Sequence, residues 1–565
     1  MITPSERIYA HLHQIYSHDA AENTYRRLME VLGSLKLPVT PFESYFSERD
    51  VTLITYGDTL YQDEEKPLQT LRRFVSDYLK SVVSTVHILP FYPYSSDDGF
   101  SVIDYYAVDE NLGTWDDIEQ ISREFKMMFD AVINHMSSQS PWFTGFLADD
   151  PAYRGLFFTE SLGTDLSGVT RPRTTPLLTE FTKTSGAAVH LWTTFSADQI
   201  DLDYRSPETL LRIVDVLLFY VQHGAQVIRL DAIAYMWKEV GTSCIHLPET
   251  HAIIQLFRAV LDHVAPHVIL ITETNVPHEE NISYFGNGAN EAQMVYNFTL
   301  PPLLLYSIIT GGVHKLAAWM NTLSTPSPQT TFFNFTASHD GIGVRPVEGI
   351  LEPSELERLV HHVQNNSGRI SYKNNPDGSR SPYELNITYV DAIGGVDGPS
   401  DVQIRRFMLS QAVKFALAGV PAVYIHSLLG SHNNIEGMLR TGHNRTINRA
   451  RLDARLIRGE LNDPTSFRGR IFRMHVELLN ARSKSPAFHP KAEQKATALH
   501  NGRVLMLERE AETEKIVALY NFTGQPQAVQ LAIPPAVDLL TGKPFPDGEV
   551  TLAPYGFHWL RISKS

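Results

Sequence analysis

The sequence predicts a (β/α)8 barrel, an α/β fold of eight parallel strands, with two inserted subdomains and a C-terminal antiparallel β domain. Eight short apolar runs are separated by helical segments such as residues 207–224 and 249–264. Continuous apolar runs bounded by turn residues are typical of parallel strands that are buried on both faces. Eight such runs with helical connections indicate a closed barrel. They begin at Val51, Val83, Met127, Val227, His267, Gln293, Thr331 and Val420.

The barrel is predicted to consist of residues 51–137, 195–340 and 398–483, with two long connections between these parts. The first connection, residues 138–194, follows the third strand, and the second, residues 341–397, follows the seventh. Both are rich in Pro, Gly and Ser. Because each leaves the carboxyl end of a strand, where barrel enzymes assemble their sites, we expect both to wall the pocket.

Segments of different character precede and follow the barrel. Residues 1–50 are predicted to be added helices, because ERIYAHLHQIY carries Ile8, Leu12 and Ile15 at helical spacing. In residues 484–565, alternating segments such as RVLMLERE and KIVALYNF predict a small antiparallel β domain.

Charge and cysteine content restrict the partners of the 565-residue chain. A formal net charge of −15 disfavours nucleic acid and anionic membranes as partners, and favours small-molecule substrates. Cys244 is the only cysteine, so neither an intrachain disulfide nor a thiolate metal cluster can form. The first residues lack the pattern of a secretory signal, and no apolar stretch is long enough for a membrane span. We therefore expect a cytoplasmic protein; a homo-oligomer stays open.

Acidic and polar residues cluster where the predicted strands end, which is the strongest functional signal in the sequence. Cleavage of a glycosidic bond with retention needs two carboxyl groups, one ionised to attack C1 and one protonated to release the leaving oxygen. A single buried Asp–Arg pair or strand-end histidine is more often structural, so the argument depends on the whole set. Its members are Asp130, Asn134 and His135 on strand three, Arg229 and Asp231 on strand four, Glu273 on strand five, and His339 and Asp340 on strand seven.

Asp231 and Glu273 are the predicted catalytic pair. Arg229 lies two residues before Asp231, so both side chains point the same way in a strand, and the guanidinium favours an ionised nucleophile. Glu273 follows the apolar run ILIT, where desolvation favours the protonated form that a general acid requires. We expect Asp340 to hold sugar hydroxyls and stabilise the transition state, with His135 and His339 as hydrogen-bond donors.

The order and spacing of these four motifs resemble the α-amylase superfamily, from Val51 to the end of the chain. Four further segments resemble the sucrose phosphorylase branch of that family: LITYGD ending at Asp58, HILPFYP from His87, LWTTFSADQIDLDY from Leu191, and GTSC at 241–244. The resemblance implies that Asp58 and Arg445 bind the donor glucose, that Phe195 is a platform under the ring and that Gln199 is a polar partner.

Arg173 and Tyr383 carry the phosphorylase interpretation. The resemblance implies that they belong to two mobile loops and take turns in contacting phosphate or the leaving sugar. Both lie in the long connections, as this role requires, and an arginine fork can donate two hydrogen bonds to phosphate. Without the resemblance, a loop arginine would be taken for a solvated surface residue.

The acceptor region departs from sucrose phosphorylases, whose fructose-contacting segment resembles LDLYQ. Here Ser381 and Glu384 replace the Asp and the Gln, so the fructose contacts should be lost. Arg380 and Lys373 add positive charge, which predicts an acceptor bearing a carboxylate or phosphate. Tyr105 replaces a histidine that sucrose phosphorylases use near the donor glucose, which makes its role less certain.

The acceptor loop and the long N-terminal extension resemble glucosylglycerate phosphorylases, which implies reversible phosphorolysis of 2-O-α-glucosylglycerate to α-glucose 1-phosphate and glycerate. Sucrose 6-phosphate phosphorylase, sucrose phosphorylase and α-glucosidase or transglucosidase activity stay open as alternatives. A non-catalytic, transporter-associated subunit of the same fold is disfavoured, because such subunits lack the carboxylates.

No organic cofactor is implied. Asn134 matches a calcium-binding position of some amylases, but no oxygen cage is evident, so no metal is expected.

Overall fold

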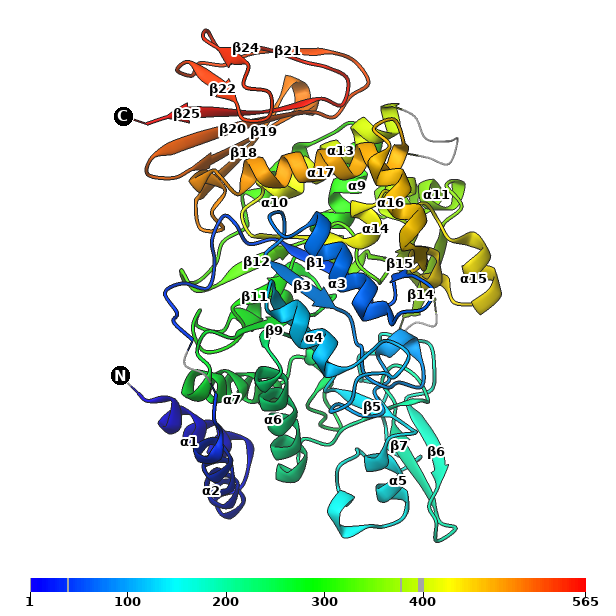
Figure 1. The fold of residues 1–565 in the computed structure, drawn as a ribbon. Coiled ribbons are helices and arrows are strands. Elements are labelled where there is room, and N and C mark those ends of the chain that lie inside the picture. Colours follow the sequence, from blue (N-terminus) through cyan, green and yellow to red (C-terminus); the bar gives the residue numbers. More distant parts are fainter. Residues whose placement is uncertain (1, 38–39, 376–378, 395–400, 565) are drawn as a thin grey trace.

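The computed structural model describes residues 2–37, 40–375, 379–394 and 401–564, and a closed barrel of eight parallel strands lies at its centre (Figure 1). The eight apolar runs form these strands, and β1 pairs with both β3 and β16, which closes the ring. The predicted (β/α)8 fold is therefore confirmed. In chain order the strands are β1 (Thr52–Thr55), β3 (Thr85–Ile88), β4 (Lys126–Ala131), β9 (Ala225–Leu230), β10 (Ile269–Thr272), β11 (Met294–Tyr296), β12 (Thr331–Asn334) and β16 (Val420–Tyr424).

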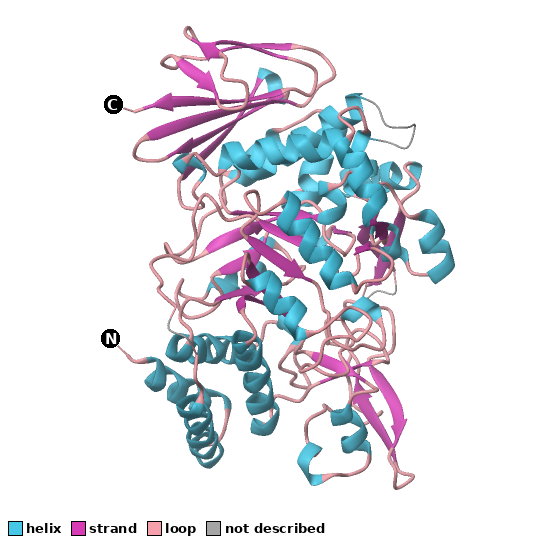
Figure 2. Cartoon of the chain, in the orientation of Figure 1, coloured by secondary structure: helices cyan, strands magenta, loops and turns pink. Residues whose placement is uncertain are grey.

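Helices surround this barrel (Figure 2). Three of them begin at a proline, Pro67, Pro207 and Pro248, whose fixed φ suits a first helical turn. None of the described helices is both long and apolar enough to cross a lipid bilayer. The helices between and after the strands include α3 (Pro67–Tyr78), α4 (Trp115–Ser122), α6 (Pro207–Gln222), α7 (Pro248–Val264), α9 (Leu300–Thr310), α10 (His314–Met320), α13 (Asp401–Ala416), α15 (Ile435–Thr441), α16 (Ala454–Asn462) and α17 (Phe467–Arg482).

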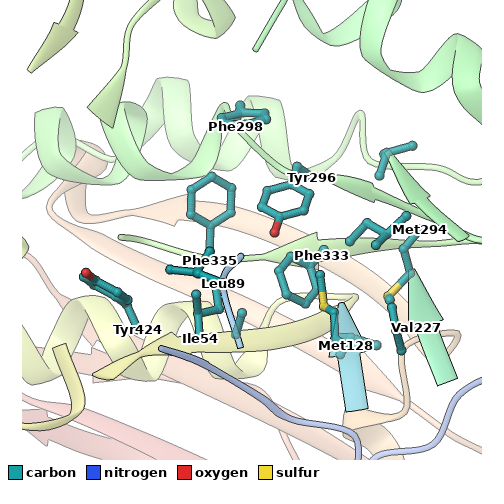
Figure 3. Close-up of a cluster of buried hydrophobic side chains, with 14 of the residues drawn as sticks. Ile54, Leu89, Met128, Val227, Met294, Tyr296, Phe298, Phe333, Phe335 and Tyr424 are labelled. Carbon is teal, nitrogen blue, oxygen red and sulfur yellow. The ribbon is translucent and has the colours of Figure 1, made fainter. Parts of the chain in front are cut away.

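The barrel interior is a packed core. Buried apolar side chains from β1, β4, β9, β11, β12 and β16 meet there, among them Ile54, Met128, Val227 and Phe333 (Figure 3). Large side chains fill the centre of such barrels in layers, so the interior cannot serve as a channel. Any substrate cavity must therefore open at the ends of the strands.

Two insertions stand at the carboxyl ends of β4 and β12. The first contains β5 (His135–Ser137), α5 (Pro141–Leu147), the hairpin of β6 (Leu178–Thr182) and β7 (Ala188–Trp192), and β8 (Gln199–Asp201). The second contains β13 (Ile342–Gly343), α11 (Pro353–Asn365), β14 (Arg369–Asn374) and β15 (Arg380–Asn386), in the sheet order β13-β15-β14. The predicted boundary between residues 397 and 398 lies outside the described residues, and the other numerical boundaries stay predictions.

The N-terminal segment forms two helices, α1 (Pro4–Ile15) and α2 (His18–Ser34), on the outside of the barrel. Helix α1 begins with a capping box of Thr3 and Glu6 and buries Ile8 and Leu12. An ion pair of 2.6 Å between Arg7 and Asp262 of α7 adds to its packing on α7.

The C-terminal segment is an antiparallel β domain at the opposite end of the molecule from α1 and α2 (Figure 1). Its two layers bury apolar side chains between them. One sheet has the order β18 (Glu493–Leu499), β19 (Val504–Glu510), β20 (Glu514–Asn521), β25 (Phe557–Ser563), β22 (Ala536–Asp538) and β23 (Pro544–Phe545), and the other pairs β21 (Gln527–Gln530) with β24 (Glu549–Leu552).

Arg482, the last residue of α17, joins three parts of the chain. Its guanidinium is fully buried and donates to five backbone carbonyl oxygens, which come from the segment before β1, the segments around α13 and β16, and the start of the β domain. Burial lowers the pKa of Arg482 to about 10, so the side chain stays charged at neutral pH. The acceptors are the carbonyls of Glu48, Asp50, Phe415, Gly419 and Phe488.

We expect Arg482→Met to lower the thermal unfolding temperature strongly, because several buried carbonyls would lose their donor at a cost of about 3 kcal/mol or more. Arg470→Met on the same helix is the matched control, since the Arg470–Asp401 ion pair is exposed and contributes at most about 1 kcal/mol. Thermal scans of both variants at one scan rate make the comparison. Equal unfolding temperatures for the two variants would contradict the role of Arg482.

Candidate active site

A cavity of about 750 Å³, partly open to solvent, lies at the carboxyl ends of the barrel strands. Barrel strands, both insertions and the loop after β3 contribute to its wall. The lining residues used below are Asp97, Phe100, His135, Arg173, Phe195, Gln199, Asp231, Tyr235, Glu273, Asn275, His339, Asp340, Tyr383, Glu384 and Arg445. Among the described residues, none of the cavity's side chains belongs to a group of three with metal-ligand spacing.

Asp231 and Glu273 lie next to each other because β9 and β10 are neighbours in the barrel. Leu230 is in register with Thr272, so the next residues on the two strands face each other across one strand spacing, about 4.8 Å. Side chains at facing positions of neighbouring strands can bring two carboxyl groups to the roughly 5–5.5 Å that separates them in retaining glycosidases. The backbone N–H of Ala232 donates to Glu273 at 3.3 Å, and its φ of 48° is unusual for a residue with a side chain.

Arg229 lies beneath the cavity and influences the protonation of Asp231 and Glu273. Its fully buried guanidinium donates to Asp130 and, at 2.7 Å, to Asp231, while Glu273 is 3.9 Å away. Burial raises the pKa of Asp231, and the direct bond to the guanidinium opposes that rise. Glu273 is desolvated without such a bond, and burial raises its pKa to about 7. The guanidinium therefore favours the ionised form of Asp231 more directly than that of Glu273.

Asp340 belongs to a second charge cluster on the other side of the cavity. Arg445 contacts Asp340 at 2.7 Å and Glu384 at 2.5 Å, and Arg449 lies 3.8 Å from Asp340. Although Asp340 is buried, these cations lower its pKa. The carboxylate is thus ionised at every pH of interest, and Arg445 is neutralised by two carboxylates.

His135, His339 and Gln199 form a polar side of the cavity. The ring of His339 stacks on Phe100 with centroids 4.7 Å apart, and burial lowers the pKa of His339, so the ring is neutral. His135 Nε2 lies 3.0 Å from the carbonyl of Phe100 and 3.3 Å from Gln199. Imidazoles and an amide can donate hydrogen bonds to the hydroxyls of a sugar.

Aromatic side chains from both insertions surround Arg173. The guanidinium carbon lies 5.9 Å from the ring centre of Phe195 and 5.7 Å from that of Tyr383. Phe195 in turn packs edge-to-face on Tyr235 at 5.6 Å. Within the described part of the chain, Arg173 forms no hydrogen bond or ion pair with a protein side chain. This arrangement presents a partly desolvated cation to an anionic ligand.

Lys238 supports the cavity from behind. Its ammonium is buried, 2.9 Å from Asp201, 3.2 Å from the amide oxygen of Asn134 and 2.8 Å from the carbonyl of Tyr235. It also reaches the carbonyl of Met236 at 3.3 Å. One cation therefore holds together the segments that carry His135, Gln199 and Tyr235, and the amide oxygen of Asn134 is already engaged by this cation.

Four residues predicted for the site do not line the cavity: Arg229, which lies beneath it, and Asp58, Tyr105 and Arg380. Asp58 pairs with Arg451 at 2.6 Å, because the strand pairing of β2 (Leu60–Tyr61) with β17 (Leu452–Asp453) directs its loop to the side. Tyr105 is buried, and its hydroxyl donates to the backbone carbonyls of Val132 and His135. Arg380 is exposed at the start of β15.

The acceptor loop places its charges differently from the prediction. Lys373 pairs with Glu348 at 3.3 Å, outside the cavity. Glu384 pairs with Arg445 rather than with Arg380 or Lys373, so its negative charge is compensated within the cavity wall. Neither Lys373 nor Arg380 reaches the cavity, since the β14–β15 hairpin holds both on its outer part.

Asp97 and Asn275 are cavity residues that the sequence analysis missed. Asp97 accepts from Gln199 at 3.3 Å, and it occurs in a loop where Asp97, Asp98 and Gly99 all have positive φ. A Cβ at Gly99 would lie 2.7 Å from the carbonyl oxygen of Pro90, so the loop needs glycine there. The signal was an Asp-Asp-Gly turn after the second strand. Asn275 lies two residues beyond Glu273, the spacing at which side chains of an extended segment share a face.

Comparisons with known proteins agree with this geometry. The model of the α-amylase catalytic domain matches residues 75–340, and that of the maltogenic amylase C-terminal domain matches residues 496–559. The solved structure of sucrose 6F-phosphate phosphorylase from Thermoanaerobacter thermosaccharolyticum is similar with a TM-score of 0.73 at 24% identity, and the match covers 89% of this chain and 98% of that one. At this identity the likeness concerns the fold alone.

Sequence relatives are closer. The protein named glucosylglycerate phosphorylase of Escherichia coli strain K12 is 43% identical over 557 residues, which are 98% of this chain and 100% of the relative. The protein named sucrose phosphorylase of Agrobacterium vitis is more distant, with 32% identity over 464 residues, 78% of this chain and 89% of the relative. The chain therefore belongs to the α-amylase family, in the branch that contains the glucosylglycerate phosphorylases and, at greater distance, the sucrose phosphorylases.

Proposed function

We propose that the protein is a retaining α-glucoside phosphorylase that converts 2-O-α-glucosylglycerate and phosphate reversibly into α-glucose 1-phosphate and glycerate. The observation that carries this proposal is the pairing of Asp231 with a neutral Glu273 on neighbouring strands, beside an Arg173 that pairs with no carboxylate of the described residues. The 43% identity over nearly the full length to a relative named glucosylglycerate phosphorylase supports the choice of acceptor. Because the sugar phosphate is charged and does not cross membranes unaided, the reaction fits the cytoplasm.

In the first half of the reaction, the ionised Asp231 attacks C1 of the glucosyl group. The bond from C1 to the glycerate oxygen breaks, and Glu273 gives its proton to that oxygen, so glycerate leaves as an alcohol. A β-linked glucosyl ester of Asp231 remains. Asp340 is ionised and close to Arg445, and its negative charge stabilises the positive charge that develops on the sugar ring.

In the second half, a phosphate oxygen attacks C1 from the face that glycerate left. Glu273 is now a carboxylate and accepts the proton of hydrogen phosphate, while the bond from C1 to Asp231 breaks. Two inversions give α-glucose 1-phosphate. A pKa of about 7 allows Glu273 to act as acid and base in turn near neutral pH.

Arg173 has to serve two anions in this scheme. Of the two arginines among the described cavity residues, Arg445 is held by Asp340 and Glu384, whereas Arg173 lies between the rings of Phe195 and Tyr383. Glycerate leaves before phosphate enters, so the two never need the cation together. We infer that Arg173 contacts the glycerate carboxylate in one half-reaction and the phosphate in the other.

The acceptor preference tests the function directly. With α-glucose 1-phosphate as donor, we expect glycerate to release phosphate far faster than fructose, because a neutral acceptor leaves Arg173 without a partner in the cavity. Phosphate release is measured with glycerate, fructose, fructose 6-phosphate and water in parallel. Faster release with fructose or fructose 6-phosphate would refute the glycerate assignment, and release with water alone would indicate a hydrolase.

A donor with a good leaving group, such as α-glucosyl fluoride, distinguishes the role of Asp231 from that of Glu273. We expect Asp231→Asn to lose at least about a thousandfold in turnover with every donor, because no ester can form. Glu273→Gln should retain ester formation with the fluoride, which needs no protonation, and should lose it with glucosylglycerate.

The pH dependence of ester formation is the control for this pair. For wild-type protein and glucosylglycerate, the rate should fall about tenfold per pH unit above pH 7, as Glu273 loses the proton that it must donate. With the fluoride this decline should be absent. A decline that persists in Glu273→Gln would assign the titration to another group.

The shared use of Arg173 predicts a paired effect. Arg173→Gln should raise KM for phosphate and for glycerate by about 10- to 100-fold each, the loss expected for hydrogen bonds to charged groups. Ester formation from α-glucosyl fluoride should change little. Arg380→Gln is the matched control from the acceptor loop and should leave both constants unchanged. An effect of Arg173→Gln on phosphate alone, or of Arg380→Gln on glycerate, would contradict the inference.

A further inference from the structure

A cluster of potential metal ligands lies at the turn between α1 and α2, remote from the cavity in sequence and position. His13 comes from the last turn of α1, and His18 and Glu22 come from one face of α2, four residues apart. A ligand nitrogen of each histidine and a carboxylate oxygen of Glu22 all lie within 4.8 Å of one another. Over the described ranges of the chain, no other three His, Cys, Asp or Glu side chains meet this criterion.

The distances suit insertion of an ion with little change. His13 Nε2 is 3.2 Å from Glu22 Oε1, and the rings of His13 and His18 have centroids 5.1 Å apart. Two ligands of a tetrahedral zinc ion, each about 2.1 Å from the metal, are roughly 3.4 Å apart. The His13–Glu22 pair therefore already has the required separation, and the exposed side chain of His18 can rotate to close the site.

A purely polar contact explains only part of this arrangement. The hydroxyl of Tyr9 donates to Glu22 Oε1, the same oxygen that His13 Nε2 contacts at 3.2 Å. His13 and Tyr9 thus satisfy one carboxylate oxygen as an ordinary surface pair would. His18 has no part in that pair, yet its ring centre lies 5.1 Å from that of His13, and one of its ring nitrogens lies within 4.8 Å of the other two ligand atoms.

We propose that His13, His18 and Glu22 bind a divalent transition-metal ion, for example Zn²⁺. The bound ion links α1 to α2. Two imidazoles and one carboxylate suit zinc, nickel or copper, whereas magnesium and calcium require more oxygen ligands. Water completes the coordination of the ion. The proposal is independent of the catalytic function proposed above.

The bound ion would link α1 and α2, and these two helices contact the barrel helices α7 and α6. Arg7 binds Asp262 of α7, and Arg27 binds Glu208 of α6 at 2.8 Å. The turn itself is tied to the barrel by the hydroxyl of Tyr16, which donates to the carbonyl of Tyr204 at 2.9 Å. An ion bound only by the closed hairpin opposes its opening and slows exchange of its backbone amides.

Calorimetric titration of the chelator-treated full-length protein with Zn²⁺ tests the site. We expect saturable binding of one ion, and an affinity at least about tenfold lower in His13→Asn, His18→Asn and Glu22→Gln, because each loses one of three ligand bonds. His361→Asn is the matched control: His361 and Glu357 form an exposed pair four residues apart on α11, at 3.5 Å, and no third ligand joins them among the described residues.

Hydrogen exchange gives a readout that a merely structural histidine would not change. Zn²⁺ should slow amide exchange within residues 4–34 in the wild type and in His361→Asn, and should have no effect in His18→Asn. Each variant should keep the wild-type rate of phosphate release, since none of the substituted residues lies at the cavity. Absence of binding by the wild type, or equal affinity in the wild type and His18→Asn, would overturn the proposal.

Discussion

The buried guanidinium of Arg229 is the interaction on which the candidate site depends. It lies at the end of β9, where water cannot screen it, and it contacts Asp130 and Asp231 directly while Glu273 stays 3.9 Å away. That difference in distance gives two carboxyl groups on adjacent strands different proton affinities. Because the strands fix these positions, the charge pattern exists before any substrate arrives.

The two insertions supply the cavity residues that the barrel strands do not. Asp231 and Glu273 directly follow the barrel strands β9 and β10, and Asp340 follows β12 after a short segment, whereas Arg173, Phe195 and Tyr383 come from the insertions after β4 and β12. In the proposed reaction, the groups that react with the sugar therefore follow barrel strands, and the groups proposed to contact glycerate and phosphate belong to the insertions. This division suits a reaction in which the sugar stays in place while its partner changes.

Internal cations organise a chain whose formal net charge is −15. Arg445 joins Asp340 to Glu384, Lys238 joins Asp201 to Asn134, and Arg482 binds five carbonyls where three parts of the chain meet. Each is costly to bury and is compensated by several oxygen partners. The consequence for the cavity is that Arg445 is already paired with two carboxylates, whereas Arg173 pairs with none among the described residues.

Local patterns in the sequence were sufficient for the barrel and for the residues at its strand ends. Apolar runs identify strands, and because a closed parallel barrel brings all carboxyl ends together, Arg229, Asp231, Glu273 and Asp340 could be placed near one another before any coordinates.

The partners of loop residues were not predictable in this way. Asp97 lines the cavity in place of Asp58, Glu384 pairs with Arg445, and Arg380 is exposed, because these positions depend on pairings with segments distant in the sequence. The sequence by itself thus determined which strands form the barrel and which carboxyl groups meet, since an apolar run is a local signal and consecutive strands of a parallel barrel are neighbours. Only the tertiary structure decided which cations stay free for a ligand, because an arginine's availability depends on the carboxylates that non-local folding brings beside it.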